Sequence, residues 1–311
     1  MSTHRIIVGT RGSALALWQT RHVVERLQAV SPDLDVHVEI IQTQGDLVRD
    51  RALSEVGGKG LFVKEIENAL MAGEIDLAVH SLKDMPTEQP GGLALGAILE
   101  RADPHDALIV RDGPDGLDSL PHGAHVGTSS LRRRAQLLAA RPDLQILDLR
   151  GNVDTRLRKL IEGQYDAVVL AAAGLIRLGH ALSPRQLLPL DLMLPAVGQG
   201  ALCIEVRTED EITQELIAPL EHLPTRRAAE AERAFLRRLE GGCQVPIGAL
   251  AQVEGDRISL SGLIASPDGA RLVRDQVQGS ASDAVPLGVA LAERLLAAGG
   301  HEILQEVRRD R

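Results

Sequence analysis

Short apolar runs rich in valine and isoleucine alternate with amphipathic stretches through the first two thirds of the chain. The opening runs predict strands over residues 5–8, 35–42 and 75–79, and the stretches between them predict helices over 13–29 and 60–71. Strands that alternate with helices form parallel sheets with helices on both faces. The pattern therefore predicts an α/β fold for this part of the chain.

Two segments recur in the same order, which indicates an internal duplication. Residues 8–13, with a Val-Gly-Thr run before a helical pattern, are echoed at 126–130, and residues 73–79 are echoed at 163–169. The first copy carries the longer stretch between its two segments. We therefore expect two domains of one topology, the first with an insertion.

The pattern changes after about residue 220. A helix is expected over 225–240, with Thr225 as a possible N-cap. It is followed by three strand-like runs with turn signals between them and a closing helical stretch. These runs cover residues 245–253, 258–265 and 272–277, and the helical stretch starts at 282. We expect a third domain of the α+β class with a small antiparallel sheet.

These observations set the expected domain boundaries. Domain 1 covers 1–100 and 200–218, domain 2 covers 104–195, and domain 3 covers 222–311. The segments between the two copies would form a hinge. The polar segment 44–59 suits a lid over a site.

Composition and charge narrow the class of protein. Apolar residues make up 44% and charged residues 25%, as in ordinary globular proteins. The net charge of −9 argues against a nucleic-acid partner. No stretch resembles a signal peptide or a membrane span, and the two cysteines lack metal-ligand spacing. We expect a cytoplasmic protein without a metal.

Ligands of α/β sheets bind beyond the carboxyl ends of the strands. These loops carry six arginines, each of which could also be an ordinary solvated side chain: Arg11, Arg132, Arg133, Arg150, Arg156 and Arg177. The Gly-Thr segments beside Ser13 and Ser129 could bind an anion at a helix N-terminus or could serve only as N-caps. Together these residues favour a small ligand rich in carboxylate or phosphate.

Asp84 and the two cysteines are the further residues to consider for chemistry. Asp84 follows a predicted strand and lies beside Lys83, so its carboxylate would stay ionised in a positive site. An equal alternative is a turn aspartate whose side chain bonds to its own backbone. Cys243 follows two glycines just past a helix end, which suits a covalent anchor. Cys203 lies inside an apolar run and is expected to be a buried core thiol.

Seven motifs in order across residues 9–248 resemble those of the porphobilinogen deaminases. They are GTRGSALALW, VGGKGLFVKEIE, HSLKDMP, GTSSLRRRAQL, LRGNVDTRL, PAVGQGAL and LEGGCQVPIG. The resemblance implies two domains like type II periplasmic binding proteins and a third that carries a cysteine on a loop. It also implies an enzyme of porphyrin and heme biosynthesis, a transferase that condenses four porphobilinogen molecules with loss of ammonia and releases hydroxymethylbilane.

The resemblance also implies the roles of individual residues. Cys243 would hold a dipyrromethane cofactor through a thioether, and Asp84 would be the catalytic carboxylate. Further cofactor contacts would come from Ser81, Lys83, Asp84, Thr128, Ser129, Arg132 and Arg133. Substrate contacts would come from Arg11, Ser13, Lys59, Phe62, Arg150, Arg156 and Arg177. The expected partner is porphobilinogen alone, bound by a monomer with no nucleic acid or membrane.

Two alternatives from other classes remain at this point. One is a non-enzymatic anion-binding protein of the same two-lobed design. The other is a thiol-dependent hydrolase that uses Cys243, for which the sequence offers no activating neighbour.

Overall fold

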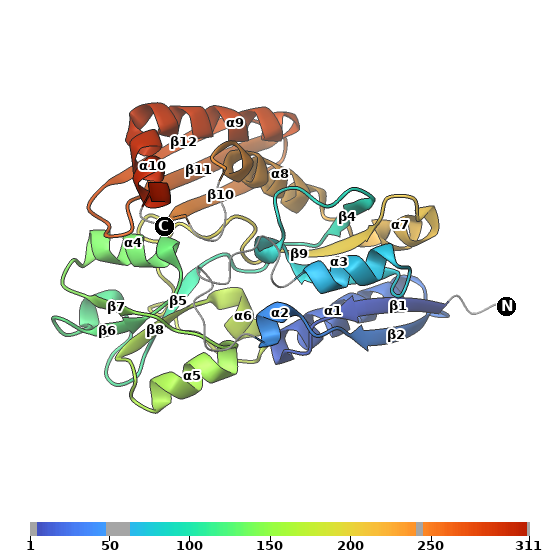
Figure 1. The fold of residues 1–311 in the computed structure, drawn as a ribbon, viewed down its shortest axis with the longest axis horizontal. Helices are drawn as coiled ribbons and strands as arrows, with labels where there is room; N and C mark the ends of the chain where they lie inside the picture. The colour runs from blue at the N-terminus through green and yellow to red at the C-terminus, as the bar shows by residue number, and fades with distance from the viewer. Residues whose placement is uncertain (1–4, 48–62, 241–244, 310–311) are drawn as a thin grey trace. The chain divides into compact units, whose positions relative to one another are not determined.

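A computed structural model of the 311-residue chain describes residues 5–47, 63–240 and 245–309. The chain divides into two compact units, each made of segments distant in sequence. Unit 1 comprises Met1–Ala102 and Ala201–Arg226, and unit 2 comprises Asp103–Gly200 and Arg227–Arg311. Figure 1 shows the elements of each unit by their labels.

Unit 1 is built on a five-stranded mixed sheet. Its strands are β1 (Arg5–Thr10), β2 (Asp35–Ile40), β3 (Leu77–Ser81), β4 (Leu93–Ile98) and β9 (Leu202–Arg207). The order is β2-β1-β3-β9-β4, with β1 parallel to β2 and β3, whereas β9 is antiparallel to both its neighbours. The helices are α1 (Ala14–Val30), α2 (Gln44–Leu47), α3 (Lys64–Met71) and α7 (Glu211–Ile217).

Helices cover both faces of this sheet. Val23 and Leu27 of α1 and Ile217 of α7 pack on one face, and Ile66 and Leu70 of α3 pack on the other. Burying apolar side chains on both faces explains why the inner strands read as continuous apolar runs. The sheet therefore offers its strand ends, rather than a face, to a ligand.

Unit 2 begins with a four-stranded sheet of related design. Its elements are β5 (Asp106–Val110), β6 (His125–Gly127), α4 (Leu131–Ala140), β7 (Gln145–Leu147), α5 (Val153–Ile161), β8 (Ala167–Ala171) and α6 (Ala172–Arg177). The order is β5-β8-β6-β7, with β5 antiparallel to β8. Read from the other edge, β7-β6-β8-β5 matches β2-β1-β3-β9 of unit 1, so the predicted duplication is confirmed.

The duplication extends to single contacts. Asp76 accepts a hydrogen bond from the amide of Ile7 at 2.8 Å, and Asp166 accepts the equivalent bond from His125 at 2.8 Å. Each aspartate follows a glycine with positive φ three residues earlier, where a helix ends. Both copies therefore enter their central strand through the same turn.

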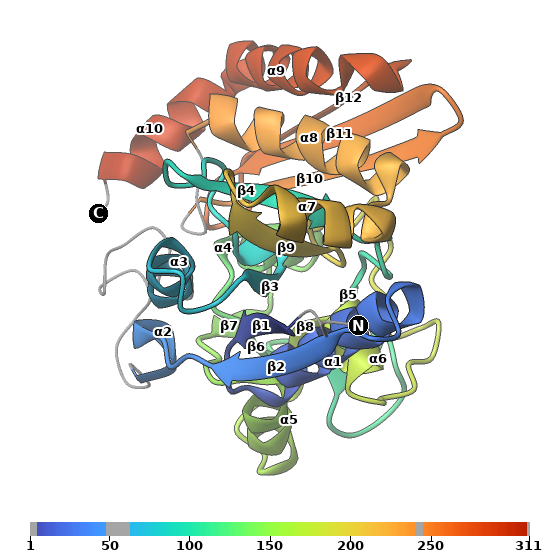
Figure 2. The ribbon, with the colours of Figure 1, turned by 90° about the vertical axis from the view of Figure 1, so that its right-hand side faces the viewer.

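The last part of unit 2 is a three-stranded antiparallel sheet with helices on one face. Its elements are α8 (Leu223–Arg238), β10 (Ile247–Glu254), β11 (Arg257–Ala265), β12 (Leu272–Ser280), α9 (Ala284–Leu295) and α10 (His301–Arg309). Beyond its first residues, which belong to unit 1, α8 lies beside α9 over the same face, with Phe235 and Leu291 in one core (Figures 1 and 2). The opposite face packs on α4 through Leu250, Leu263 and Ala135.

The fold class predicted from the sequence is confirmed, with two corrections. Both α/β sheets are mixed rather than parallel, because β9 and β5 each run against their neighbours. Helix α8 begins at Leu223, so Thr225 is not its N-cap, and its hydroxyl lies 2.8 Å from Nδ1 of His222. The division into three domains stays a prediction.

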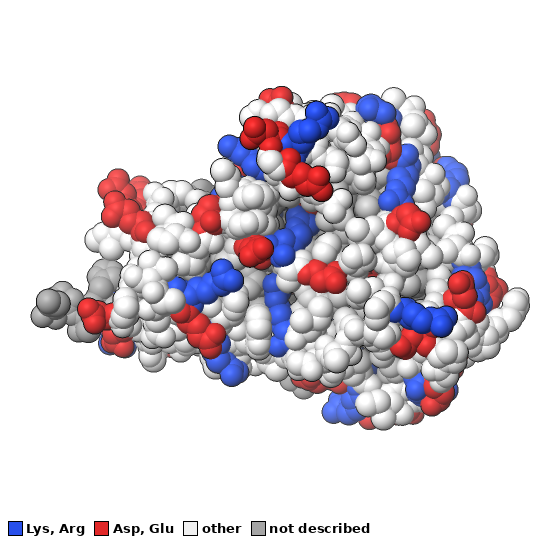
Figure 3. All heavy atoms as spheres, turned by 180° about the vertical axis from the view of Figure 1, so that it is seen from behind, with Lys and Arg blue, Asp and Glu red and all other residues white. Residues whose placement is uncertain are grey.

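On the face shown in Figure 3, basic and acidic side chains are interspersed. Within the described ranges, no helix is both long enough and apolar enough to cross a membrane.

Candidate functional site

A pocket in unit 1 lies where β1 and β3 end. These strands are parallel neighbours, so their carboxyl ends meet at one edge of the sheet. Its polar lining consists of Arg11, Ser13, Gln19, His80, Ser81 and Asp84. Four of these six residues belong to the predicted site, and the topology brings them together from positions about 70 residues apart in sequence.

Local structure fixes how these side chains are presented. Ser13 caps α1 by accepting a hydrogen bond from the amide of Ala16 at 3.2 Å, and Gln19 of the same helix donates to Oγ of Ser81 at 2.9 Å. After β3 the chain makes a 3₁₀ turn over Leu82–Asp84. Leu82 is buried in this turn whereas Asp84 is exposed, so the carboxylate faces outward beside Lys83.

A buried acidic cluster lies behind the pocket. Nε2 of His80 is 3.1 Å from Oε2 of Glu205, and neither side chain is more than a few per cent exposed. Glu67 of α3 is also buried. Burial raises the pKa of Glu67, the charge of Glu205 raises it further, and His80 opposes this in part. Oε1 of each glutamate lacks a hydrogen-bond partner within the described parts of the chain.

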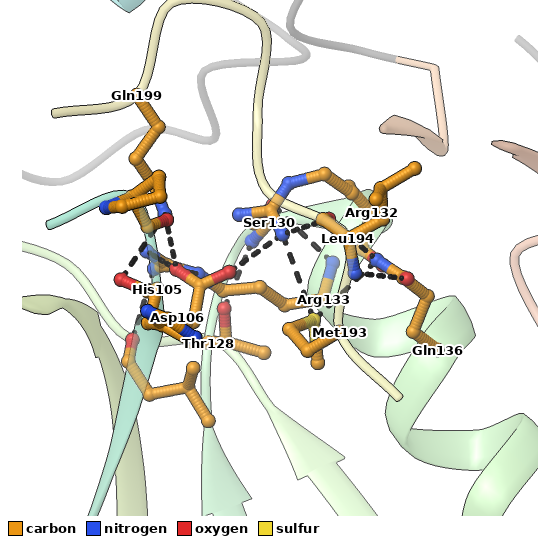
Figure 4. A network of polar contacts seen from close by, with 12 residues as sticks. His105, Asp106, Thr128, Ser130, Arg132, Arg133, Gln136, Met193, Leu194 and Gln199 are labelled. Carbon is orange, nitrogen blue, oxygen red and sulfur yellow. Dashed lines mark hydrogen bonds and ion pairs between the residues drawn. The ribbon is translucent and has the colours of Figure 1, made fainter. Parts of the chain in front are cut away.

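In unit 2 a buried ion-pair network centres on Asp106, the first residue of β5 (Figure 4). Oδ2 of Asp106 accepts from Nη1 of Arg132 at 2.6 Å, and Oδ1 accepts from Nε and Nη2 of Arg133 at 3.0 and 2.7 Å. Both arginines belong to the first turn of α4, where Ser130 is the N-cap. The predicted arginine pair is therefore held together at one point.

Charge outweighs burial at Asp106. Burial alone would raise the pKa of this carboxyl, but the charges and N–H groups of Arg132 and Arg133 hold it well below its usual range. Burial lowers the pKa of the Arg132 guanidinium, which Asp106 opposes. The network is thus ionised at neutral pH, with two cations around one anion.

Of the other predicted residues of unit 2, Thr128, Ser129 and Arg150 lie on loops after β6 and β7, whereas Arg156 belongs to α5 and Arg177 is the last residue of α6. Oγ of Ser129 both donates to and accepts from the backbone of Leu149, at 3.0 and 3.1 Å, which ties two of these loops together. Oγ1 of Thr128 accepts from the amide of Ser130 at 3.2 Å. These hydroxyls therefore also shape the loops.

The remaining arginines have contacts to backbone carbonyls nearby. Arg156 donates from Nε to Gly151, and Arg177 donates from Nη2 to Gly200, both at 2.8 Å. Burial lowers the pKa of Arg177 to about 10. Arg150 lies on the loop between Leu149 and α5, where its carbonyl accepts from Lys159 at 3.3 Å.

Cys243, Lys59 and Phe62 lie outside the described residues, as does most of the predicted lid, of which the first residues form α2. Cys203 is buried as predicted, with Sγ 3.8 Å from the carbonyl of His80.

Sequence reasoning missed Asp106, Glu205 and Gln19. A signal existed for two of them, since Glu205 interrupts an apolar strand and Asp106 begins one, and a lone buried carboxylate needs a partner. Gln19 sits in an amphipathic helix among similar polar residues and carried no signal.

Unit 1 and the first sheet of unit 2 make this a duplicated α/β protein with ionised side chains at its strand ends. Comparison with known families defines it further. Residues 6–215 match the model described as "Porphobilinogen deaminase, dipyromethane cofactor binding domain", and residues 227–297 match "Porphobilinogen deaminase, C-terminal domain".

Curated relatives agree over nearly the full length. A porphobilinogen deaminase of Pelotomaculum thermopropionicum is 54% identical over 305 residues, covering 98% of this chain and 97% of its own. One of Roseiflexus sp. is 56% identical over 299 residues, covering 96% and 98%. Among solved structures, the periplasmic VFT2 domain of Bordetella pertussis BvgS covers 69% of this chain and 85% of its own, with 17% identity and a TM-score of 0.39.

The chain belongs to the porphobilinogen deaminase family. It is therefore an enzyme, and its cofactor is a dipyrromethane.

Proposed function

We propose that this enzyme condenses four porphobilinogen molecules head to tail, with loss of ammonia, and releases hydroxymethylbilane. The observation that carries the proposal is the pocket where Asp84 stands with Arg11 and Ser13 at the ends of β1 and β3. An exposed carboxylate beside cationic side chains suits a substrate that bears two carboxylates and develops positive charge on its ring. The family match over both parts of the chain supports the same reaction.

The residues of the chain fit an anionic dipyrromethane. Acetate and propionate groups need cations, and the Asp106 network holds one more positive charge than negative in a buried setting. Cys243 would anchor the cofactor, and Ser81, Lys83, Thr128, Ser129 and Arg132 would hold it, with Arg133 supporting the site beside Arg132. When bound, the cofactor supplies the free pyrrole carbon to which the first substrate is added.

Asp84 would act directly on the substrate. As the C–N bond of porphobilinogen breaks, its electron pair leaves with ammonia and the pyrrole ring becomes cationic. The carboxylate would accept a hydrogen bond from the ring N–H and stabilise that cation electrostatically. It would then guide the proton that leaves the ring carbon after the new carbon–carbon bond forms.

The substrate's own carboxylates need separate partners. Arg11 and Ser13 line the pocket of unit 1, and we assign them to the incoming porphobilinogen. Arg150, Arg156 and Arg177 of unit 2 would bind the carboxylates of the growing chain. Lys59 and Phe62 complete the assignment on the basis of the resemblance alone.

The intact mass of the purified protein tests this assignment. We expect an adduct of two pyrrole units on the wild type, no adduct on Cys243→Ser, and a normal adduct on the control Cys203→Ser, whose thiol is buried elsewhere. An active wild type without the adduct would contradict the proposal. It would leave the anion-binding protein or the thiol hydrolase as the better interpretation, according to whether turnover needs Cys243.

A second variant tests the carboxylate. Asp84→Ala should carry the adduct, because Asp84 is an exposed turn residue that folding does not need, yet it should turn over almost no porphobilinogen. Near-normal product formation would remove Asp84 from this role.

We also infer that the enzyme acts as a monomer in the cytoplasm with porphobilinogen as its only partner. Light scattering of the purified protein checks the first point, since a mass near 33.4 kDa is expected.

A further inference from the structure

Arg132 and Arg133, neighbours in α4, differ in how many of their side-chain nitrogens donate hydrogen bonds in the Asp106 network (Figure 4). Arg133 engages all three of its side-chain nitrogens: Nε and Nη2 donate to Asp106, and Nη1 donates to the carbonyl of Val169 at 2.9 Å. Arg132 donates from Nη1, to Asp106, to the carbonyl of Leu194 at 2.8 Å and to Sδ of Met193. Within the described part of the chain, Nε and Nη2 of Arg132 make no such bond.

The acceptors that hold Arg132 are themselves fixed. Gln136, one turn further along α4, accepts from the amide of Leu194 at 2.7 Å and donates to its carbonyl at 3.1 Å. Gln199 donates to Oδ1 of Asp106 at 3.0 Å and to the carbonyl of Pro104 at 2.8 Å. The plane of the Arg132 guanidinium is thus set by groups that cannot easily move.

The charge of the network is unbalanced. Two guanidinium groups face one carboxylate, and the three side chains are 5–8% exposed or fully buried. A buried cation without a counterion is costly, so the arrangement favours binding of one further anion. The donors that remain for that anion are those of Arg132.

We propose that Asp106 and Arg133 are positioning residues that orient Arg132, and that Arg132 alone grips one carboxylate of the cofactor through Nε and Nη2. The inference rests on the proposed function and deepens it, because it separates two arginines that the sequence presents as equivalent. Parallel donation from Nε and Nη2 is the geometry with which a guanidinium binds a carboxylate.

The test measures cofactor loading in purified variants, as the fraction of chains that carry the two-pyrrole adduct. We expect Asp106→Asn to lower this fraction about tenfold or more, the scale of a lost charge-assisted pair. Asp106→Glu, which keeps the charge, should recover most of the loading. Asp143→Asn breaks a separate ion pair of unit 2, with Arg141, and should load normally.

Two further variants keep the test decisive if Asp106→Asn does not fold. Arg133→Lys retains the charge but loses the paired N–H donors that hold Asp106. Arg132→Lys loses the paired donors proposed for the cofactor. Both variants should carry little cofactor, although circular dichroism should show that they are folded. In the fraction that does load, the KM for porphobilinogen should match that of the wild type, because these residues act on the cofactor. A general structural defect would not spare KM in this way.

The outcomes separate this inference from the proposed function. A wild type without the adduct would refute the proposed function itself. A wild type with the adduct, together with folded Asp106→Asn and Arg133→Lys that load as fully as it does, would overturn the positioning role alone.

Discussion

Replacing Glu67 by glutamine should stabilise the protein, although it replaces a titratable group near His80, which lines the pocket of unit 1. Glu67 and Glu205 are two buried carboxyls near His80, and each has an oxygen without a hydrogen-bond partner among the described residues. Glutamine has nearly the same shape, removes the repulsion and adds an N–H donor. Relieving one unsatisfied buried group is worth about 1–3 kcal/mol.

The effect should depend on pH in a defined direction. The folded protein holds a proton on Glu67 more tightly than the unfolded chain does, since its pKa is raised. The stability that this proton confers is complete below the ordinary glutamate pKa of about 4.3 and is lost as pH rises through the raised value. The advantage of Glu67→Gln should therefore be small at about pH 4 and grow toward neutral pH.

Calorimetric melting between about pH 4 and 8 measures this difference, at about 2–4 °C for each kcal/mol in a unit of this size. Glu74→Gln is the matched control, because Glu74 is an exposed glutamate that follows the same helix. An unchanged melting temperature across the whole range, or an advantage that grows as pH falls, would refute the reasoning.

Three other changes test the framework. Gly127→Ala places a Cβ 2.9 Å from the ring of Tyr165 and should cost about 1–3 kcal/mol in urea unfolding. Gly269→Ala, at φ +73° with backbone atoms of α4 only 2.5–2.6 Å from the new Cβ, should lower both the melting temperature and cofactor loading, because α4 carries Arg132. In acid titration, the stability that ionised Asp106 contributes should be complete above about pH 4 and be lost as pH falls further. Below about pH 4, the stability of Asp106→Asn should therefore depend less on pH than that of the wild type.

The sequence predicted the architecture well because its signals are local. Alternating runs gave the strands and helices to within a few residues, and the echo of 73–79 at 163–169 revealed the duplication. The direction of β5 and β9 was not predictable, since it depends on which strands they pair with across about 60 and 125 residues.

The site was predicted in part for the same reason. Asp84, Arg11 and Ser13 lie directly after predicted strands, so the rule for α/β sheets placed them together. The contacts of Asp106 with Arg132 and of His80 with Glu205 join residues 26 and 125 positions apart, and no local sequence pattern predicts them. The engagement of all three side-chain nitrogens of Arg133 in internal bonds was not predictable, since its sequence context equals that of Arg132.

The paired contacts of Asp76 and Asp166 make each copy an internal reference for the other. A substitution at either aspartate removes the same hydrogen bond to a strand amide. The two substitutions should therefore lower the stability of the protein equally if the turn alone matters. A difference between the two losses of stability would measure the effect of each copy's surroundings. Those surroundings are a pocket beside an exposed carboxylate in the first copy and a buried excess of positive charge in the second.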